Sequence, residues 1–598
     1  MTPPTIAPTR PEIVTRGVPQ TRPGWVERVT SADHKSVGTL YIGTALVFLI
    51  LAAVEFTLMR VQLFVPENSL ISPEIFNRLL SAAGVTVVVL FAIPLALGFI
   101  AYLVPLQIGA RGVAFPRLNL FSYWLYAIGA VAIYASFLYS VPEAGTYSLP
   151  PLSETAFSPT HGVDAWITGV ALACAGFTLF AVNMVVTLGR MRAPGLAWRR
   201  LPLFSWAATG TSYLLLVLAP AMLAAVVMLM IDRQFDGVFF EAGEGGAPLL
   251  YEHLAMLFAA GAYAIVLLLA AGAISEILPV FSGQPIFSHR GAAVSIVAIA
   301  VLVPLAWMQS MYEAPLAEGW TIMAMAFALA LLVPIGTLLF IWVATMWRGA
   351  LRLRGPMLYA LVAISTMSFG LAAELAYSVI PVGWQLDNTT AAQAATLYVL
   401  VGGGVLGGFA ALGYWFPKLC GRLLGEGVGK IALGLIFAGI HLYALPMFLA
   451  GLDGQPVDVF KYYENTGVDG DNLLASIGAF VLVAGILLEL ANAAHSWNNG
   501  LEAGHDPWGA STLEWFALSP PPPHNFDAVP DVRSTEPLRD IREAVRRRTE
   551  LWEAPPRART ELPETPPTAA VGVAESESHP GSEPAATDED DGKSPSVA

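Results

Sequence analysis

The strongest constraint on this chain is a long, largely apolar run from Leu249 to Ser282, LLYEHLAMLFAAGAYAIVLLLAAGAISEILPVFS. An α-helix rises about 1.5 Å per residue, so roughly 20 apolar residues cross the hydrocarbon core of a bilayer. This run is long enough to do so. It therefore predicts a membrane-spanning helix.

Eleven further apolar runs recur along the chain. Inside a bilayer a helix satisfies all of its own backbone hydrogen bonds, whereas an open strand cannot. We therefore expect an all-α membrane protein with twelve transmembrane helices. The predicted spans lie near residues 38–59, 79–104, 119–140, 164–188, 206–231, 250–278, 292–312, 320–346, 357–381, 393–417, 429–452 and 473–493.

Composition supports a membrane protein. Hydrophobic residues make up 55% of the chain and charged residues only 13%, whereas soluble domains carry about 25% charged residues. The two cysteines, Cys174 and Cys420, both lie in or beside apolar runs. This excludes a disulfide framework and a cysteine-ligated zinc site.

Loop charges predict the orientation. Lys and Arg collect in cytoplasmic loops of membrane proteins, and an inside N-terminus puts thirteen of them in the inner loops and four in the outer ones. We expect both termini in the cytoplasm. The inner set is Arg111, Arg117, Arg190, Arg192, Arg199, Arg200, Arg290, Arg348, Arg352, Arg354, Lys418, Arg422 and Lys430, and the outer set is Arg60, Arg78, Arg233 and Lys461.

The two ends of the chain differ from its middle. Residues 1–34 are read as a cytoplasmic arm; residues 1–30 are polar and Pro-rich, with no apolar core of a signal peptide. A membrane domain is expected over 35–500 and a cytoplasmic segment over 501–533. From about Ser534 the chain is rich in Pro, Glu, Ala and Ser, so we expect 534–598 to be disordered. Much of the net charge of −14 lies there.

Several blocks together resemble one known family. The run from Leu249 keeps Tyr251, His253 and Phe258 of a pattern typical of subunit I of the heme-copper oxidases, as in cytochrome c oxidase. Similar blocks occur at 31–42, 104–125, 191–207 and 511–515. The resemblance covers roughly residues 30–530. It implies a twelve-helix bundle in a bacterial plasma membrane, two hemes and a copper ion, and neighbouring subunits II and III.

The positions that match the family's metal ligands carry other residues in this chain. The resemblance places the two low-spin heme ligands at Ala83 and Leu397 and the high-spin heme ligand at Ala395. It places the three copper ligands at Ala260, Gln309 and Ser310. None is His. Ala and Leu have no donor atom, and Gln and Ser are poor substitutes for imidazole on copper.

The family's proton-path positions are substituted as well. The resemblance places the acidic entrance at Gly112, the gating Glu at Ala262, and the Lys of the second channel at Leu338. The Tyr that the family cross-links to a copper ligand falls at Ala264.

From these substitutions we expect no heme and no copper. The chain would be a cytochrome c oxidase subunit I-like pseudoenzyme, acting as a structural, assembly or regulatory subunit of a respiratory complex. Its expected partners are subunit II- or III-like proteins and the lipid bilayer, and no nucleic acid. Two alternatives stay open. One is a catalytic oxidase subunit that reduces oxygen and pumps protons with unrecognised ligands, and the other is a transport or cavity-binding protein for a lipid, quinone or ion.

Glu374 is the residue that favours the transport alternative. It lies in the apolar run SFGLAAELAYSVIP, and ionisable groups inside a membrane are costly and often functional. It is either a new polar site or a single hydrogen-bonded acid. Structural roles are expected for Glu55 and Glu276, and His253 and His441 are expected to be hydrogen-bonded helix residues.

Overall fold

The computed structural model describes residues 25–138, 142–312 and 317–553. The chain divides into two compact units, Met1–Ala544 and Val545–Ala598. The first unit carries the membrane domain. The second begins within the last helix, and most of it lies outside the described residues.

Twelve helices in the described residues are long and apolar enough to cross a membrane, as the sequence predicts. Four of them combine more than one helix: α3–η1–α4, α9–η5, α10–α11 and α14–η6–α15. The spans are α2 (His34–Gln62), α3 to α4 (Pro73–Gln107), α5 (Pro116–Ala135), α6 (His161–Arg190), α7 (Leu203–Phe235), α8 (Pro248–Ser282), α9 to η5 (His289–Met311), α10 to α11 (Glu318–Met346), α12 (Gly355–Tyr377), α14 to α15 (Thr390–Cys420), α16 (Glu426–Leu452) and α17 (Asp469–Asn499).

Short helices complete the described structure. They lie at span ends or in connections: α1 (Trp25–Thr30), η2 (Ser136–Leu138), η3 (Trp198–Arg200), η4 (Ala242–Glu244), α13 (Ile380–Leu386) and η7 (Leu513–Trp515), followed by the longer α18 (Pro537–Glu553).

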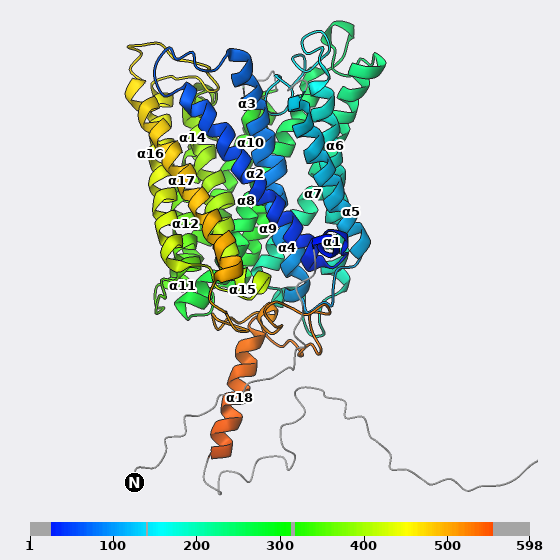
Figure 1. Ribbon diagram of the computed structural model, residues 1–598, viewed down its shortest axis with the longest axis vertical. Coiled ribbons are helices and arrows are strands. Elements are labelled where there is room, and N and C mark those ends of the chain that lie inside the picture. The colour runs from blue at the N-terminus through cyan, green and yellow to red at the C-terminus, as the bar shows by residue number, and fades with distance from the viewer. Residues whose placement is uncertain (1–24, 139–141, 313–316, 554–598) are drawn as a thin grey trace, which may run out of the picture. The chain divides into compact units, whose positions relative to one another are not determined.

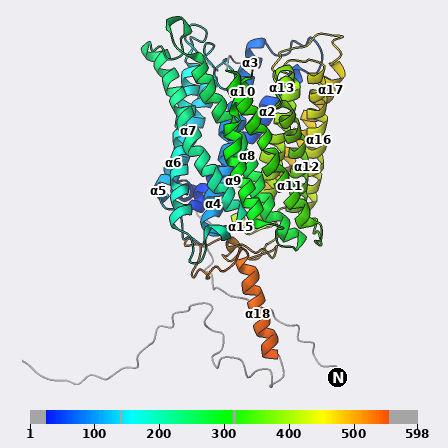
Figure 2. The same cartoon turned by 180° about the vertical axis from the view of Figure 1, so that it is seen from behind.

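The spanning helices run alongside one another as a bundle (Figures 1 and 2). Consecutive helices pack together from α5 to α8, and α17 packs on both α16 and α2, so the last span meets the first. Small residues permit the closest approaches. A Cβ on Gly439 of α16 would lie 2.3 Å from the backbone nitrogen of Leu482 on α17.

Two spans contain a wider π-helical turn, η1 (Thr86–Ala92) and η6 (Leu400–Leu406). Pro94 follows η1 and has no N–H to donate to the carbonyl of Leu90, four residues earlier. That carbonyl instead accepts a hydrogen bond from the Tyr126 hydroxyl at 2.8 Å. In η6 the run Gly402–Gly404 supplies a backbone without side chains.

The C-terminal segment 501–533 packs against one end of the bundle. Asn525 donates to the carbonyl of Ala110 at 2.8 Å and bonds the buried ring of His34. Val532 donates through its backbone to Pro194 at 3.3 Å. This segment therefore links the start of α2 to two inter-helix connections, all at the end of the bundle where α1 also lies (Figure 1).

The expected disorder from Ser534 differs from the structure, in which α18 occupies Pro537–Glu553. Its first turns contain good helix formers and charge pairs one turn apart. Arg539 contacts both Glu536 and Glu543, which stabilises a helix. The composition argument averaged this charged segment with the Pro-rich remainder. Residues 554–598 and 1–24, also assigned from sequence, lie outside the described residues.

Candidate functional site

Helix α8 carries three of the substituted positions. Ala262 and Ala264 are buried, with 4% and 0% of their surface exposed. Ala260 is partly exposed. All three present a methyl group only, so none can donate a ligand or a proton. The polar residue on this stretch is Tyr263, between the two buried alanines, which the sequence analysis did not single out.

Gln309 and Ser310 lie on η5 (Trp307–Met311) and have different surroundings. Gln309 donates to the backbone carbonyl of Glu374 at 3.3 Å and accepts from the Ser378 hydroxyl at 3.1 Å. Ser310 is exposed and bonds only the carbonyl of Trp307 within its own turn. Gln309 therefore joins η5 to α12, and Ser310 does not.

The three positions expected for heme ligands lie on neighbouring spans. Ala83 on α3 is 1% exposed and Ala395 on α14 is 0% exposed. Leu397 is partly buried against the main core. Ala395 packs in a small cluster with Tyr377 and Ala391. These side chains fill space as ordinary core residues.

Two proton-path positions are separated from this region. Gly112 lies in the connection between α4 and α5, and a Cβ there would meet nothing within 4 Å. Leu338 is 2% exposed on α11 and belongs to the main core. Neither joins a polar chain in the described structure.

A polar group unites several helices near the substituted positions, and we name it the Glu374 cluster: Tyr263, Gln309, Glu374, Ser378 and Thr396. The Thr396 hydroxyl donates to Glu374 Oε1 at 3.4 Å. The Tyr263 side chain bonds Thr396 and interacts electrostatically with Glu374. Ser378 donates to the carbonyl of Glu374 at 3.0 Å. Sequence reasoning found Glu374 but missed the hydroxyls around it, because they come from other helices.

His253 and His441, the two histidines within the spans predicted from sequence, are both in contact with a partner. His253 Nδ1 lies 3.2 Å from the sulfur of Met311, and the ring also meets Trp307. His441 Nδ1 lies 2.9 Å from the Tyr398 hydroxyl. This agrees with the expectation of bonded helix histidines.

A second polar group lies at the end of the bundle that holds the C-terminal segment. We name it the Glu514 network: Gln107, Ser205, Trp415 and Glu514, all 3% exposed or less. Gln107 donates to Glu514 Oε1 at 3.2 Å and accepts from Ser205 at 2.7 Å; Trp415 donates to the same carboxyl oxygen at 3.4 Å. Burial raises the pKa of the Glu514 carboxyl.

Glu55 and Glu276 are buried acids with neutral donors. Glu55 accepts from Tyr134 at 3.0 Å, and Glu276 accepts from the backbone N–H of Phe204 at 3.2 Å. Their 6% and 8% exposures place them inside the protein. These contacts fit the structural roles expected for them.

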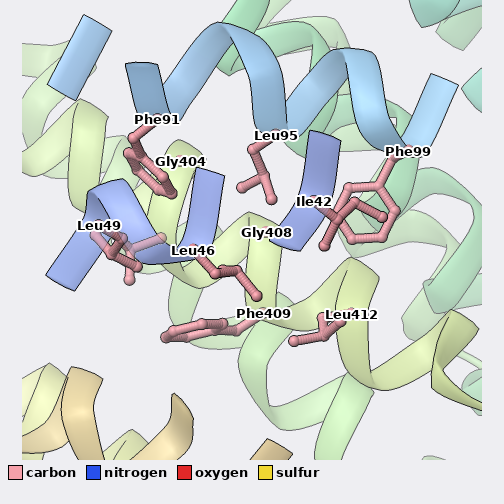
Figure 3. A pocket seen from close by; sticks show the side chains of 11 residues that line it. Ile42, Leu46, Leu49, Phe91, Leu95, Phe99, Gly404, Gly408, Phe409 and Leu412 are labelled. Carbon is pink, nitrogen blue, oxygen red and sulfur yellow. The ribbon is translucent and has the colours of Figure 1, made fainter. Parts of the chain in front are cut away.

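The six positions expected for metal ligands offer no imidazole in this chain. Among the described residues, no group of three or more His, Cys, Asp or Glu could hold a metal ion. A narrow gap lies between α2, η1–α4 and η6–α15, and only apolar side chains and glycines line it (Figure 3). Phe91 and Gly404 of the two π-turns face it. No ligand atom for iron or copper is offered there.

Comparisons with known proteins give one consistent answer. The family described as "Cytochrome C and Quinol oxidase polypeptide I" matches residues 36–481. The chain is 36% identical to cytochrome c oxidase subunit 1 of Thermostichus vulcanus over 510 residues, 85% of this chain and 92% of that protein. It is 34% identical to cytochrome c oxidase subunit 1 of Bacillus subtilis (strain 168), over 85% of this chain and 82% of that protein.

The fold agrees with these matches. A solved structure described as a heme-copper terminal oxidase dimer superposes with a TM-score of 0.68 and 15% identity, covering 78% of this chain and 84% of that one. At this identity the superposition establishes the shared fold of the bundle.

The expectation that the chain has no heme and no copper is contradicted by these comparisons, because the family and its matched relatives are cytochrome c oxidase subunit 1, which binds both. The inference went from single substituted positions to the whole protein. The substituted residues themselves still offer no imidazole, so no reaction step is assigned to them. The chain is a multi-pass membrane protein that belongs to the heme-copper oxidase subunit I family.

Proposed function

We propose that this protein is a subunit I-type component of a bacterial aerobic respiratory complex, with a structural, assembly or regulatory role. Its partners would be subunit II- or III-like membrane proteins. In this role, none of the substituted positions takes part in oxygen chemistry.

One observation carries the proposal. The end of the bundle with the C-terminal segment is held by buried, mutually bonded polar residues, whereas the positions expected to do chemistry present Ala, Leu, Gly or internally bonded Gln and Ser. Lys418, 0% exposed, donates to the carbonyls of Ala517 and Leu518 at 2.7 and 3.3 Å. Lys418 thus ties the C-terminal segment to the bundle, whereas the positions expected for metal ligands carry no imidazole, and this combination fits a docking role.

The test is purification of the tagged full-length protein from native membranes in mild detergent. Oxidase-type subunits should co-purify in a fixed ratio, and oxygen consumption should remain with fractions that contain a second, distinct subunit I. Cyanide-sensitive turnover by this chain freed of every other subunit I would overturn the proposal.

We also propose that both termini face the cytoplasm in the plasma membrane. The support is the loop charge bias, thirteen Lys and Arg against four. Single cysteines placed at Ala350 and at Glu464, exposed positions in connections at opposite ends of the bundle, should react with an impermeant thiol reagent only at Glu464 in intact cells. Labelling of Ala350 alone would invert the orientation.

A second candidate is transport of an ion through the interior. The Glu374 cluster favours it. In this cluster a carboxyl side chain in the described part of the interior stays partly exposed beside hydroxyl groups.

A further inference from the structure

Glu374 lies one turn before the end of α12, at the end of the bundle away from the C-terminal segment. Three hydroxyl-bearing residues lie around the Glu374 carboxyl. Tyr263 comes from α8, Thr396 from α14 and Tyr377 from α12 itself. Asp387, directly after α13, is the other charged group that acts on the carboxyl. Asp387 has a partner of its own.

No cation among the described residues balances this carboxyl. Glu374 is absent from every ion pair found there, and the groups that act on it are acidic, phenolic or hydroxylic. An unpaired carboxylate in a medium of low dielectric is expensive. The charge must therefore be neutralised by something that comes and goes, or by a permanent proton.

The residues around the carboxyl are less buried than the core beside them. Glu374, Tyr263, Gln309 and Thr396 all stay partly exposed, although Ala395, next to Thr396, is completely buried. Only one carboxyl oxygen of Glu374 has a donor at hydrogen-bond distance among the bonds found.

An unused hydroxyl lies beside the carboxyl. Tyr377 is 4% exposed, and its hydroxyl has no hydrogen-bond partner in the described structure. It acts electrostatically on Glu374 one turn away. A buried donor of this kind costs about 1–3 kcal/mol when unpaired, and a carboxylate or a water molecule at Glu374 would satisfy it.

We propose that Glu374, with Tyr263, Thr396 and Tyr377, forms a proton-exchange site near the end of the bundle opposite the C-terminal segment. The carboxyl O–H bond of Glu374 breaks and its proton passes to water. The carboxylate that remains is held by the hydroxyls of Thr396, Tyr263 and Tyr377 until water returns a proton. The ligand of the site is thus the proton, which water delivers. This inference is independent of the proposed docking role.

The experiment is infrared difference spectroscopy of the purified full-length protein across a pH series, which detects the C=O stretch of protonated carboxyl groups. The wild type should lose a carboxyl band as the pH rises, and Glu374→Gln should abolish that band. Thr396→Val should move its midpoint, because one hydrogen bond to the charged form is gone.

Glu489→Gln is the matched control. Glu489 is a buried acid on α17, bonded to Asn492, and its replacement should leave the Glu374 band unchanged. Melting curves of all variants check the fold. Identical wild-type and Glu374→Gln spectra at every pH would overturn the proposal, and so would a band that responds to added Na⁺ at constant pH, since the ligand would then be an alkali cation.

Discussion

The Glu514 network and the Glu374 cluster are both polar groups inside an apolar bundle, yet they differ in how they are satisfied. In the first, Gln107 and Trp415 both donate to one oxygen of Glu514, Ser205 donates to Gln107, and all four side chains are fully buried. In the second, Glu374 keeps one weak side-chain donor and partial exposure.

The difference separates two uses of a buried acid. A fully buried carboxyl with two side-chain donors on one oxygen fixes the arrangement of the elements around it, because any movement leaves several groups unpaired. A partly exposed carboxyl with one side-chain donor can change its protonation state without breaking the fold. The first kind of carboxyl serves assembly of the fold, and the second serves proton exchange.

The largest effect should come from Lys418→Met, which tests the rigid region. Lys418 is fully buried and bonds two carbonyls of the C-terminal segment. A buried acceptor left without its donor costs about 1–3 kcal/mol, so the variant should lose stability of that order and expose residues 501–533 to protease. Thermal unfolding in detergent and limited proteolysis measure both. Lys430→Met, at a half-exposed site, is the control and should change neither.

Helix spacing in the centre should respond to one glycine and not to its neighbour. A Cβ on Gly402 would lie 2.7 Å from the backbone nitrogen of Met367 on α12, whereas one on Gly404 would lie 3.7 Å from its nearest atom, on Phe91. Gly402→Ala should therefore cost about 1–3 kcal/mol through overpacking, and Gly404→Ala should be nearly neutral. Equal melting temperatures for the two variants would contradict the close packing of η6 on α12.

Stability should depend on pH through Glu514. Burial raises the pKa of this carboxyl above that of the unfolded chain, so the folded state binds the proton more tightly. Stability is then greatest below the unfolded pKa and falls as the pH rises toward the folded pKa. Glu514→Gln should flatten this fall in a series of melting curves. An unchanged slope in the variant would assign the pH dependence to other groups.

The smallest effect distinguishes Gln309 from Ser310. Gln309→Ala removes two bonds between η5 and α12, for a loss of about 1 kcal/mol. Ser310→Ala removes one exposed bond within its own turn and should stay within about 0.5 kcal/mol of the wild type. Chemical denaturation of both variants would resolve the difference, and a larger loss for Ser310→Ala would reverse the assignment.

Much of the fold could be predicted from the sequence, because membrane insertion leaves few choices. Apolar runs of sufficient length, such as the one from Leu249, give helices, and the twelve spans agree with the structure. The candidate site was predicted only in part. Glu374 was conspicuous as an acid in an apolar run, but Tyr263 and Thr396 are ordinary helix residues until α8, α12 and α14 bring them together.

Two sequence expectations did not hold, for related reasons. The disordered tail was assigned by average composition, and the local charge pairs of Arg539 form a helix instead. The absence of hemes and copper was assigned from individual positions such as Ala83 and Gln309, while the match to the family extends over residues 36–481. For the tail, the average composition of a long segment was applied to one short helix. For the cofactors, single positions were applied to the whole protein.

By itself, the sequence determined the number of spans and the family, since both depend on long, repeated patterns of side-chain polarity along the chain. Only the tertiary structure decided how the polar side chains are satisfied. Glu514 accepts hydrogen bonds from Gln107 and Trp415, which lie 407 and 99 residues away in the chain. Glu374 stays partly exposed. The physical reason is that the cost of a buried charge depends on its neighbours in space, and these are set by helix packing and not by spacing along the sequence.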